Sequence, residues 1–314
     1  MTIHPPTETN IERFAAALRA GDLVAFATET VYGLGADATN SVAVLKIYEK
    51  KGRPRFNPLI VHVADLAMAE RYAIISPLAR QLMQFWPGPL TLVLPMRPDS
   101  GLSDIVTAGL DTVAIRMPAH QLARQLIQRA GVPVAAPSAN PSGKLSPTTA
   151  AQVDRGFKGD IDVIDGGSST SGVESTILAV TGDKVTQLRA GALPRDEIEA
   201  AIGRSVAIAA EGGAIVAPGM LSSHYAPNAP VRLNAAAPEP GEAYLAFGAV
   251  PAGAGGDTLN LSPSGDLREA AQNLFSMLHR IDESGAPIAV APIPLTGLGE
   301  AINDRLRRAA APRP

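Results

Sequence analysis

Apolar residues in the N-terminal part of the chain alternate between helical spacing and short continuous runs. Residues 11–20 carry apolar side chains at helical spacing, and Gly21-Asp22 ends this helix before residues 23–27, an apolar run typical of a buried strand. Further helices are predicted over residues 41–50, 78–85, 121–130 and 195–202. Further strands are predicted over residues 58–63, 90–94, 113–116, 132–136, 175–180 and 185–189. Because helices and strands alternate irregularly, the pattern indicates an α/β domain with a mixed sheet.

The pattern changes at residue 206. Residues 206–228 are rich in alanine, glycine and proline and show no sustained period, which is typical of an ordered linker. Strand and helix signals then alternate again over residues 243–247, 267–281, 288–291 and 298–310. We therefore expect three parts, which are a large domain over residues 1–205, a linker over residues 206–230 and a small α/β domain over residues 231–314.

Composition narrows the class of protein. Of the 314 residues 46% are hydrophobic, enough for a substantial core, and the net charge of −3 provides no overall field that would concentrate nucleic acid. The absence of cysteine excludes disulfides, thiolate metal sites and cysteine nucleophiles. Residues 1–10 lack the basic start and apolar run of a secretory signal, and no apolar stretch approaches the roughly 20 residues needed to cross a bilayer. We expect a cytoplasmic protein that does not contact membranes.

The first candidate site is the segment Thr28–Gly35, which follows the first predicted strand. Ligands in α/β folds favour such strand ends, and the hydroxyls of Thr28, Thr30 and Tyr32 could orient a polar substrate. Residues 32–35 carry two glycines, which predict a tight turn. A simple polar turn explains the segment at least as well, because a lone Gly-x-Gly is weak evidence.

The second candidate is the basic loop Lys50–Pro58, with cations at residues 50, 51, 53 and 55. Clustered cations repel one another, so a triphosphate would be a natural partner. The alternative is a solvated charge cluster at a helix C-terminus, which the helix dipole favours. His62, in the following strand, is by itself more typical of a core histidine than of a ligand.

Arg116 closes the apolar strand of residues 112–116 and needs an acidic partner. A substrate carboxylate and a structural ion pair are equally good explanations. The segment Ala136–Gly143 also follows a buried strand and displays hydroxyl and amide groups on a loop fixed by prolines and glycine, although ordinary turn chemistry accounts for that composition.

Three shorter segments complete the set, namely residues 172–176, 189–192 and 222–227. Jointly, the polar loops at strand ends indicate a site for an anionic nucleotide and a small polar substrate. The P-loop lysine motif, the dinucleotide glycine fingerprint and the His-Glu-x-x-His zinc motif are all missing, so the phosphate site is of a less common kind.

In combination these motifs resemble the threonylcarbamoyl-AMP synthase family, which is built on the YrdC-like domain, in its longer two-domain form. The matching segments are residues 28–35, 51–53, 57–59, 85–91, 138–140, 173–176, 189–191, 224–227 and 297–306. The resemblance implies a YrdC-like twisted mixed sheet with flanking helices, plus a smaller C-terminal Rossmann-like α/β domain joined by an ordered linker.

The family converts L-threonine, bicarbonate and ATP into L-threonylcarbamoyl-AMP and pyrophosphate, for tRNA modification. The resemblance implies that threonine is bound by Thr30, His62, Arg116, Ala136 and Ser175. It implies that ATP is bound by Arg53, Asn57, Thr112, Ser138, Arg189 and Tyr225. It implies catalytic roles for Lys51, Arg53, Ser138 and Asn140. Mg²⁺ would be held by the ATP phosphates rather than by protein ligands, Tyr225 would act as a lid, and downstream tRNA threonylcarbamoyl-transfer proteins would take the product without stable nucleic-acid binding by this chain.

Three alternatives remain open. A nonenzymatic RNA-binding YrdC-like module is disfavoured by the net charge of −3 and by only 4% aromatic residues. A carbamoyl-transfer protein with another acceptor would carry zinc-finger segments, for which this chain has no cysteine. A catalytically silent relative is disfavoured because Lys51, Arg53, Ser138 and Asn140 are all present.

Overall fold

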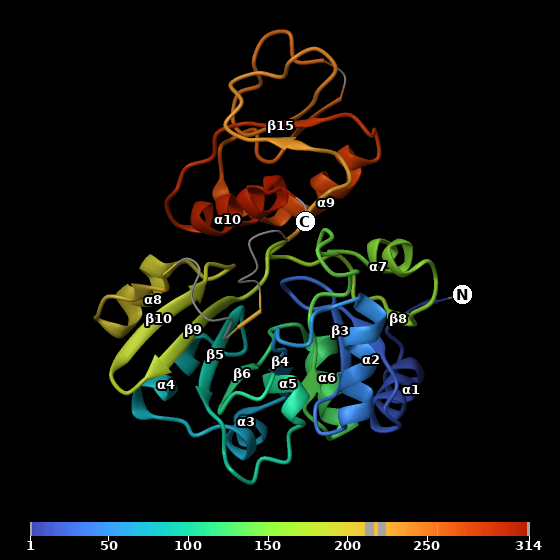
Figure 1. Ribbon diagram of the computed structural model, residues 1–314, viewed down its shortest axis with the longest axis vertical. Coiled ribbons are helices and arrows are strands. Elements are labelled where there is room, and N and C mark those ends of the chain that lie inside the picture. The colour runs from blue at the N-terminus through green and yellow to red at the C-terminus, as the bar shows by residue number, and fades with distance from the viewer. Residues whose placement is uncertain (1, 211–216, 219–223, 256, 313–314) are drawn as a thin grey trace.

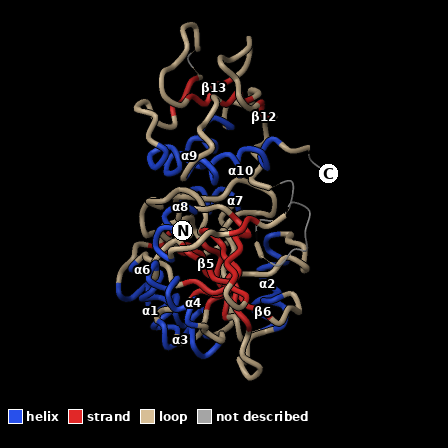
Figure 2. The backbone as a smooth tube through the Cα atoms, turned by 90° about the vertical axis from the view of Figure 1, so that its left-hand side faces the viewer, coloured by secondary structure: helices blue, strands red, loops and turns tan. Residues whose placement is uncertain are grey.

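Two lobes of unequal size make up the computed structural model, which describes residues 2–210, 217–218, 224–255 and 257–312 (Figure 1). The larger lobe contains the N-terminus, and the smaller lobe, formed by the C-terminal part of the chain, lies at one end of it. A view turned by 90° shows the same separation, with α9 and α10 of the small lobe facing the large one (Figure 2). None of the described helices is both long enough and apolar enough to span a membrane.

The larger lobe is built on one mixed sheet. Among the described residues its strands are β1 (Ile3–His4), β2 (Val24–Phe26), β3 (Gly33–Asp37), β4 (Ile60–His62), β5 (Leu90–Pro95), β6 (Thr112–Arg116), β7 (Val134–Ala135), β8 (Val163–Ile164), β9 (Thr176–Thr181), β10 (Lys184–Arg189) and β11 (Ala207–Ile208). Their order across the sheet is β1-β8-β2-β3-β7-β4-β6-β5-β9-β10-β11. β4 runs parallel to β6, whereas β7 runs antiparallel to both of its neighbours, β3 and β4, so the predicted mixed sheet is confirmed.

Helices flank this sheet. They are α1 (Glu8–Arg19), α2 (Ser41–Lys51), α3 (Leu66–Tyr72), α4 (Pro77–Leu82), the 3₁₀ helix η1 (Met83–Phe85), α5 (Asp104–Thr107), α6 (Gln121–Ala130), α7 (Ala150–Phe157) and α8 (Arg195–Ile202). α1 begins at the N-cap Thr7, whose side chain accepts from Asn10 N, and α2 ends at Gly52 in the left-handed conformation. α1 and α6 pack against each other, and their apolar faces join the main core under the sheet.

The sequence predicted a turn over residues 32–35, and this is wrong because β3 occupies most of that segment. β3 pairs antiparallel with β2, with Ala25 opposite Leu34. A Cβ on Gly35 would lie 2.7 Å from the Phe26 ring and 2.8 Å from Val134. Gly35 therefore serves close packing between neighbouring strands rather than a turn.

The larger sheet continues past residue 205. β11 pairs parallel with β10, with Ala207 opposite Thr186. The first residues of the predicted linker thus belong to the large lobe. Residues 211–216 and 219–223, in the middle of that linker, lie outside the described residues.

The small lobe is an all-parallel sheet covered by two helices. Its described elements are β12 (Val231–Arg232), β13 (Ala243–Ala246), β14 (Thr258–Asn260), α9 (Leu267–Asp282), β15 (Ile288–Val290) and α10 (Leu298–Ala310), with strand order β12-β15-β13-β14. Both helices lie between this sheet and the large lobe (Figure 1). The predicted strands and helices of this lobe are confirmed. The sequence analysis did not predict β12 and β14, whose two or three residues are too few to show a period.

Candidate functional site

A small buried cavity lies where several strands of the larger sheet begin or end. Its volume is about 50 Å³, and its walls come from segments far apart in the sequence. The lining residues that the sequence had assigned to threonine or ATP are Thr30, Arg53, His62, Arg116, Ala136, Ser138, Ser175, Arg189 and Tyr225. The fold therefore brings most of the predicted site residues to one place.

Strand register places His62 beside Arg116. β4 and β6 are parallel neighbours, and His62 pairs with Arg116 at the last position of both strands. The imidazole is buried edge-on to the ring of Phe26, with centroids 6.4 Å apart. Burial, assisted by the charge of Arg116, lowers the pKa of His62 to about 3. His62 is consequently neutral at physiological pH and can act only as a hydrogen-bonding group.

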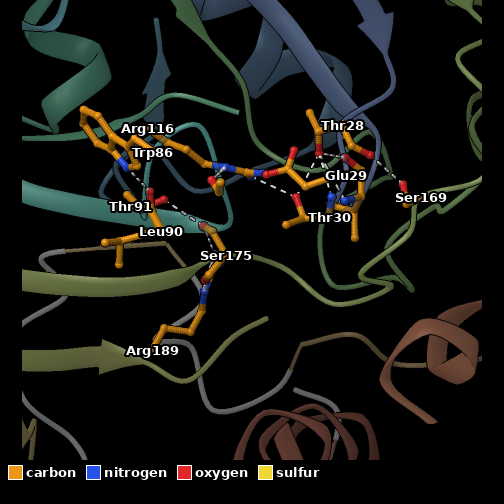
Figure 3. A network of polar contacts seen from close by, with 12 residues as sticks. Thr28, Glu29, Thr30, Trp86, Leu90, Thr91, Arg116, Ser169, Ser175 and Arg189 are labelled. Carbon is orange, nitrogen blue, oxygen red and sulfur yellow. Dashed lines mark hydrogen bonds and ion pairs between the residues drawn. The ribbon is translucent and has the colours of Figure 1, made fainter. Parts of the chain in front are cut away.

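Arg116 has a carboxylate beside it. Its Nη2 lies 2.6 Å from Glu29 Oε1, Nη1 donates to Thr30 Oγ1 at 2.9 Å, and Nε donates to the Gly88 carbonyl (Figure 3). Burial alone would raise the pKa of Glu29, but the Arg116 guanidinium holds it below its ordinary value. The structural ion pair considered from the sequence is formed, and the same guanidinium also lines the cavity.

Only two of the four basic side chains in the basic loop Lys50–Pro58 are buried. Lys50 pairs with Asp160 at 3.1 Å near the surface, and Arg55 is exposed. Lys51 and Arg53 are buried, with 4% and 8% of their surface exposed, and neither takes part in an ion pair among the described residues. Burial lowers the pKa of Arg53 to about 10 and that of Lys51 well below its usual value. Buried cations without carboxylates make this region favourable for an anion.

Lys51 holds the 136–143 loop in place through the backbone carbonyls of the loop. Its Nζ donates to the carbonyl of Ser138 at 2.6 Å and also to that of Asn140. Ser142 N donates in turn to the Lys51 carbonyl at 2.7 Å, and Asn140 Nδ2 donates to the carbonyl of Lys144 at 2.9 Å. Ser138 lines the cavity, whereas Lys51 and Asn140 do not. The two latter residues shape the loop from which Ser138 reaches the cavity.

A chain of hydrogen bonds joins β10, β9 and β5. Arg189 donates to the Ser175 carbonyl from Nε at 3.1 Å and from Nη2 at 2.8 Å, and to Ser175 Oγ at 3.2 Å. Ser175 Oγ is 2.7 Å from Thr91 Oγ1, as Figure 3 shows. Arg189, which the sequence assigned to ATP, is therefore hydrogen-bonded to Ser175, which the sequence assigned to threonine.

His224 and Tyr225 line the cavity. Tyr225 is 1% exposed, and its φ of 60° lies in the left-handed region, which a residue with a Cβ rarely adopts. Its ring contacts that of His224 at 4.0 Å and that of Phe275 in α9 at 5.6 Å between centroids. Ala226 N donates to the Gly143 carbonyl at 2.8 Å. Contacts on several sides thus hold Tyr225 in a strained backbone conformation.

Two further predicted residues do not line the cavity. Asn57 is buried, and its carbonyl accepts from Tyr48 Oη and Arg53 Nε. Thr112 begins β6, whereas Arg116 ends it, so the two lie at opposite ends of the strand. The sequence assigned Thr112 to ATP, but this geometry does not bring it to the other residues.

The structure adds lining residues to which the sequence analysis assigned no role, among them Ile60, Glu174 and Pro218. Glu29 was also unassigned, although an acidic residue between Thr28 and Thr30, directly after a buried strand, predicts a buried partner. Pro218 lies in the segment without periodicity, where the sequence carries no signal. Among the described residues, no group of three histidine, cysteine or acidic side chains could hold a metal ion.

The site thus consists of buried cations and hydroxyls gathered at the strand ends of a mixed α/β sheet. Two family models match the chain. One, of the Sua5, YciO and YrdC proteins and described as "Telomere recombination", matches residues 16–191, and the other, "Threonylcarbamoyl-AMP synthase, C-terminal domain", matches residues 193–311. The chain belongs to the threonylcarbamoyl-AMP synthase family.

Similar proteins cover nearly the whole chain. The threonylcarbamoyl-AMP synthase of Bacillus subtilis is 43% identical over 98% of this chain and 94% of its own length, and that of Pyrococcus abyssi is 42% identical over 98% and 95%. The crystal structure of P. abyssi Sua5 complexed with L-threonine superposes with a TM-score of 0.89 at 41% identity and covers 99% of this chain and 98% of the other. These findings confirm the predicted family and fold class. Escherichia coli YciO, at 19% identity and a TM-score of 0.53, shares the fold alone.

Proposed function

We propose that this chain is an L-threonylcarbamoyladenylate synthase, which converts L-threonine, bicarbonate and ATP into L-threonylcarbamoyl-AMP, pyrophosphate and water. The observation that supports it most is one cavity that joins Arg53 and Arg189, both buried and outside every ion pair found among the described residues, to the Arg116, Thr30 and Ser175 cluster. The full-length similarity to proteins named threonylcarbamoyl-AMP synthase supports the same reaction.

The cationic side of the cavity is the proposed phosphate site. Arg53 and Arg189 would neutralise the triphosphate, and guanidinium groups suit that purpose because they donate two parallel hydrogen bonds to phosphate oxygens. Ser138, on its anchored loop, would donate a further hydrogen bond. Any divalent ion, with Mg²⁺ the proposed one, would arrive bound to the ATP phosphates, because the described residues offer no carboxylate cluster for it.

The opposite side is the proposed threonine site. Arg116 would bind the substrate carboxylate with the guanidinium edge that faces the cavity, while Glu29 fixes the orientation of the side chain. The hydroxyls of Thr30 and Ser175 and the neutral imidazole of His62 are suited to the threonine hydroxyl and amine.

The proposed reaction has two steps. The threonine amine adds to the carbon of bicarbonate or CO₂ to form a carbamate, with water lost when bicarbonate is used. A carbamate oxygen then attacks the α-phosphorus of ATP, the bond from that phosphorus to the bridging oxygen breaks, and pyrophosphate leaves. The protein contributes positioning and charge stabilisation, and we assign no side chain as general base.

His224 and Tyr225 form the proposed lid. A cavity of about 50 Å³ has room for a few water molecules, whereas pockets for drug-sized ligands have roughly 300–1,000 Å³. The cavity must therefore widen to admit ATP, and an outward movement of these two side chains would widen it. Once closed, they would exclude water from the carbamate and the adenylate.

We further propose that the product passes to tRNA threonylcarbamoyl-transfer proteins in the cytoplasm, and that no stable nucleic-acid complex of this chain is required, since its net charge is −3.

The test of the reaction is pyrophosphate release from ATP with and without L-threonine and bicarbonate, with L-serine as the control amino acid. Release that requires threonine and bicarbonate together supports the proposal. Release that is independent of threonine, or no release at all, contradicts it.

A further inference from the structure

The small lobe packs directly onto the loops that carry the proposed site. A single apolar cluster joins Val31, Leu145 and Val173 of the large lobe to residues of α9 and α10. The approach is tightest at Gly172, where an added Cβ would lie 2.2 Å from the Ala271 carbonyl oxygen in α9. The contact between the lobes is therefore a packed core that reaches the residues flanking the cavity.

One charged side chain of α10 enters this contact. Arg305 has none of its surface exposed and is the largest fully buried side chain among the described residues. Its Nε donates to Glu174 Oε2 at 2.8 Å, and its Nη1 donates to the Ala190 carbonyl at 2.8 Å and to Asp304 Oδ2 of the same helix at 2.7 Å. Its guanidinium also lies over the ring of Tyr225, 5.2 Å from the centroid. Burying an arginine so completely is unfavourable unless its charge is offset, and here the carboxylates of Glu174 and Asp304 offset it.

The contacts with Glu174, Ala190 and Tyr225 reach the proposed site. Glu174 lines the cavity and precedes Ser175, and its Oε1 accepts from Ser146 Oγ at 2.5 Å. Ala190 follows Arg189, and Arg189 donates a hydrogen bond to the Ser175 carbonyl. Tyr225 also lines the cavity.

We propose that Arg305 is a positioning residue, through which the small lobe fixes Glu174-Ser175, Arg189-Ala190 and Tyr225 relative to one another. The planar guanidinium holds the Glu174 carboxylate with one nitrogen and the Ala190 carbonyl with another, while its face supports the Tyr225 ring. The small lobe thereby completes the active site without contributing a group to the reacting atoms. This inference rests on the proposed function, since the residues that it positions are those assigned to threonine and ATP.

A purely structural role would be charge neutralisation of the buried Glu174. Lysine could supply that charge, but its single ammonium cannot reproduce the fork of Nε and Nη1. Arg305→Lys therefore separates the two roles. Arg307→Met is the matched control, because Arg307 is exposed on the same helix and outside the contact.

The experiment uses the full-length chain and measures thermal unfolding, threonine- and bicarbonate-dependent pyrophosphate release, and the dissociation constant of ATP by calorimetry. For Arg305→Lys we expect kcat to fall by about tenfold to a hundredfold, since small misplacements of positioned groups have effects of that size. We also expect weaker ATP binding, with a cooperative unfolding transition retained. Arg307→Met should behave as the native chain.

An Arg305→Lys protein with native kcat and native ATP affinity overturns the inference and leaves only charge neutralisation. Arg305→Met, which leaves Glu174 unpaired, should show a larger loss of kcat together with a lower unfolding temperature, and if it fails to fold, Arg305→Lys decides alone. If the native chain releases no threonine-dependent pyrophosphate, the proposed function fails separately. The positioning role is then decided by ATP affinity, which must be weaker in Arg305→Lys than in Arg307→Met.

Discussion

At the residue scale, the proposed site depends on cations that are buried without carboxylates. Arg53 donates to the carbonyls of Asn57 and Pro58, which do not neutralise its charge. Burying such a charge lowers the stability of the folded chain. The arrangement is understandable if a ligand supplies the missing negative charge, because a site can favour its ligand at the expense of the stability of the free protein.

Replacing Arg53 by methionine should separate the effect of this charge on ATP binding from its effect on the stability of the folded chain. We expect ATP affinity to fall by about tenfold or more, because charge-assisted hydrogen bonds contribute about 1.5–3 kcal/mol. The unfolding temperature should change little, because the gain from removing a buried charge opposes the loss of the donors to the Asn57 and Pro58 carbonyls. Calorimetric titration with ATP and thermal unfolding measure both quantities. Arg55→Met, at the exposed position of the same loop, is the control, and equal ATP affinity in the two variants would remove Arg53 from the phosphate site.

His62 makes folding stability depend on pH. Burial lowers its pKa to about 3 from an ordinary value of 6.5, so between these values the unfolded chain binds a proton that the folded chain does not. The contribution of neutral His62 is therefore complete above about pH 6.5 and is lost as the pH falls, by up to about 1.4 kcal/mol per pH unit. We expect the free energy of unfolding in urea to decline less between pH 7 and pH 5 for His62→Gln than for the native chain. Parallel declines would mean that His62 is not held neutral.

At the scale of single elements, the 136–143 loop shows how a predicted catalytic segment is held in place by a neighbouring helix. Lys51 ends α2 and anchors the loop through the carbonyls of Ser138 and Asn140. Lys51 does not line the cavity, so in this structure it acts on the loop.

Lys51→Met should therefore loosen the loop. Two buried carbonyls would lose a charged donor, at about 1–3 kcal/mol for each unsatisfied group. We expect a lower unfolding temperature and a lower kcat, with a smaller change in the dissociation constant of threonine, whose proposed partners lie on other strands. Lys50→Met, at the neighbouring surface position, serves as the control. A Lys51→Met protein that loses only ATP affinity, with native stability, would favour direct contact of Lys51 with phosphate.

The elements that the sequence predicted well are those with a long, regular period. α6, α8, α9 and α10 lie within a residue or two of their predicted bounds, because an amphipathic face repeats over several turns. β3 was missed because Gly33 and Gly35 are typical of turns, and only the packing of Phe26 against Gly35 shows why they lie in a strand.

The candidate site was predictable to the extent that strand ends converge. His62 and Arg116 end parallel neighbouring strands, so a correct sheet topology is enough to bring them together. The pairing of Arg116 with Glu29 was not predictable, because either a substrate or a side chain could satisfy a strand-end arginine. The burial of Arg305 was equally hidden, since a helix near the chain end gives no sequence signal for a partner more than a hundred positions away, such as Glu174.

At the scale of the whole molecule, the two lobes differ in how their cores are completed. The main core of the large lobe lies wholly within residues 11–206. The core of the small lobe instead includes Val31, Leu145 and Val173, which belong to the large lobe. Separating the lobes should therefore leave the large one with a complete core and an exposed apolar patch beside its active site.

A fragment of residues 1–209 tests this asymmetry. The chain is cut after residue 209 because β11 pairs with β10 and Ala209 N still donates to the Gln187 carbonyl at 3.0 Å. We expect a folded domain with a cooperative but lower unfolding temperature, and with threonine-dependent pyrophosphate release reduced by more than tenfold, since Tyr225 and Arg305 are both removed. Circular dichroism and the pyrophosphate assay measure the two properties. Replacing Val31 and Val173 by threonine in the fragment should improve its solubility without restoring turnover. Native turnover in the fragment would show that neither the lid nor the small lobe is needed for the reaction. A fragment without cooperative unfolding would show that the large lobe depends on the small one for its fold as well as for its active site.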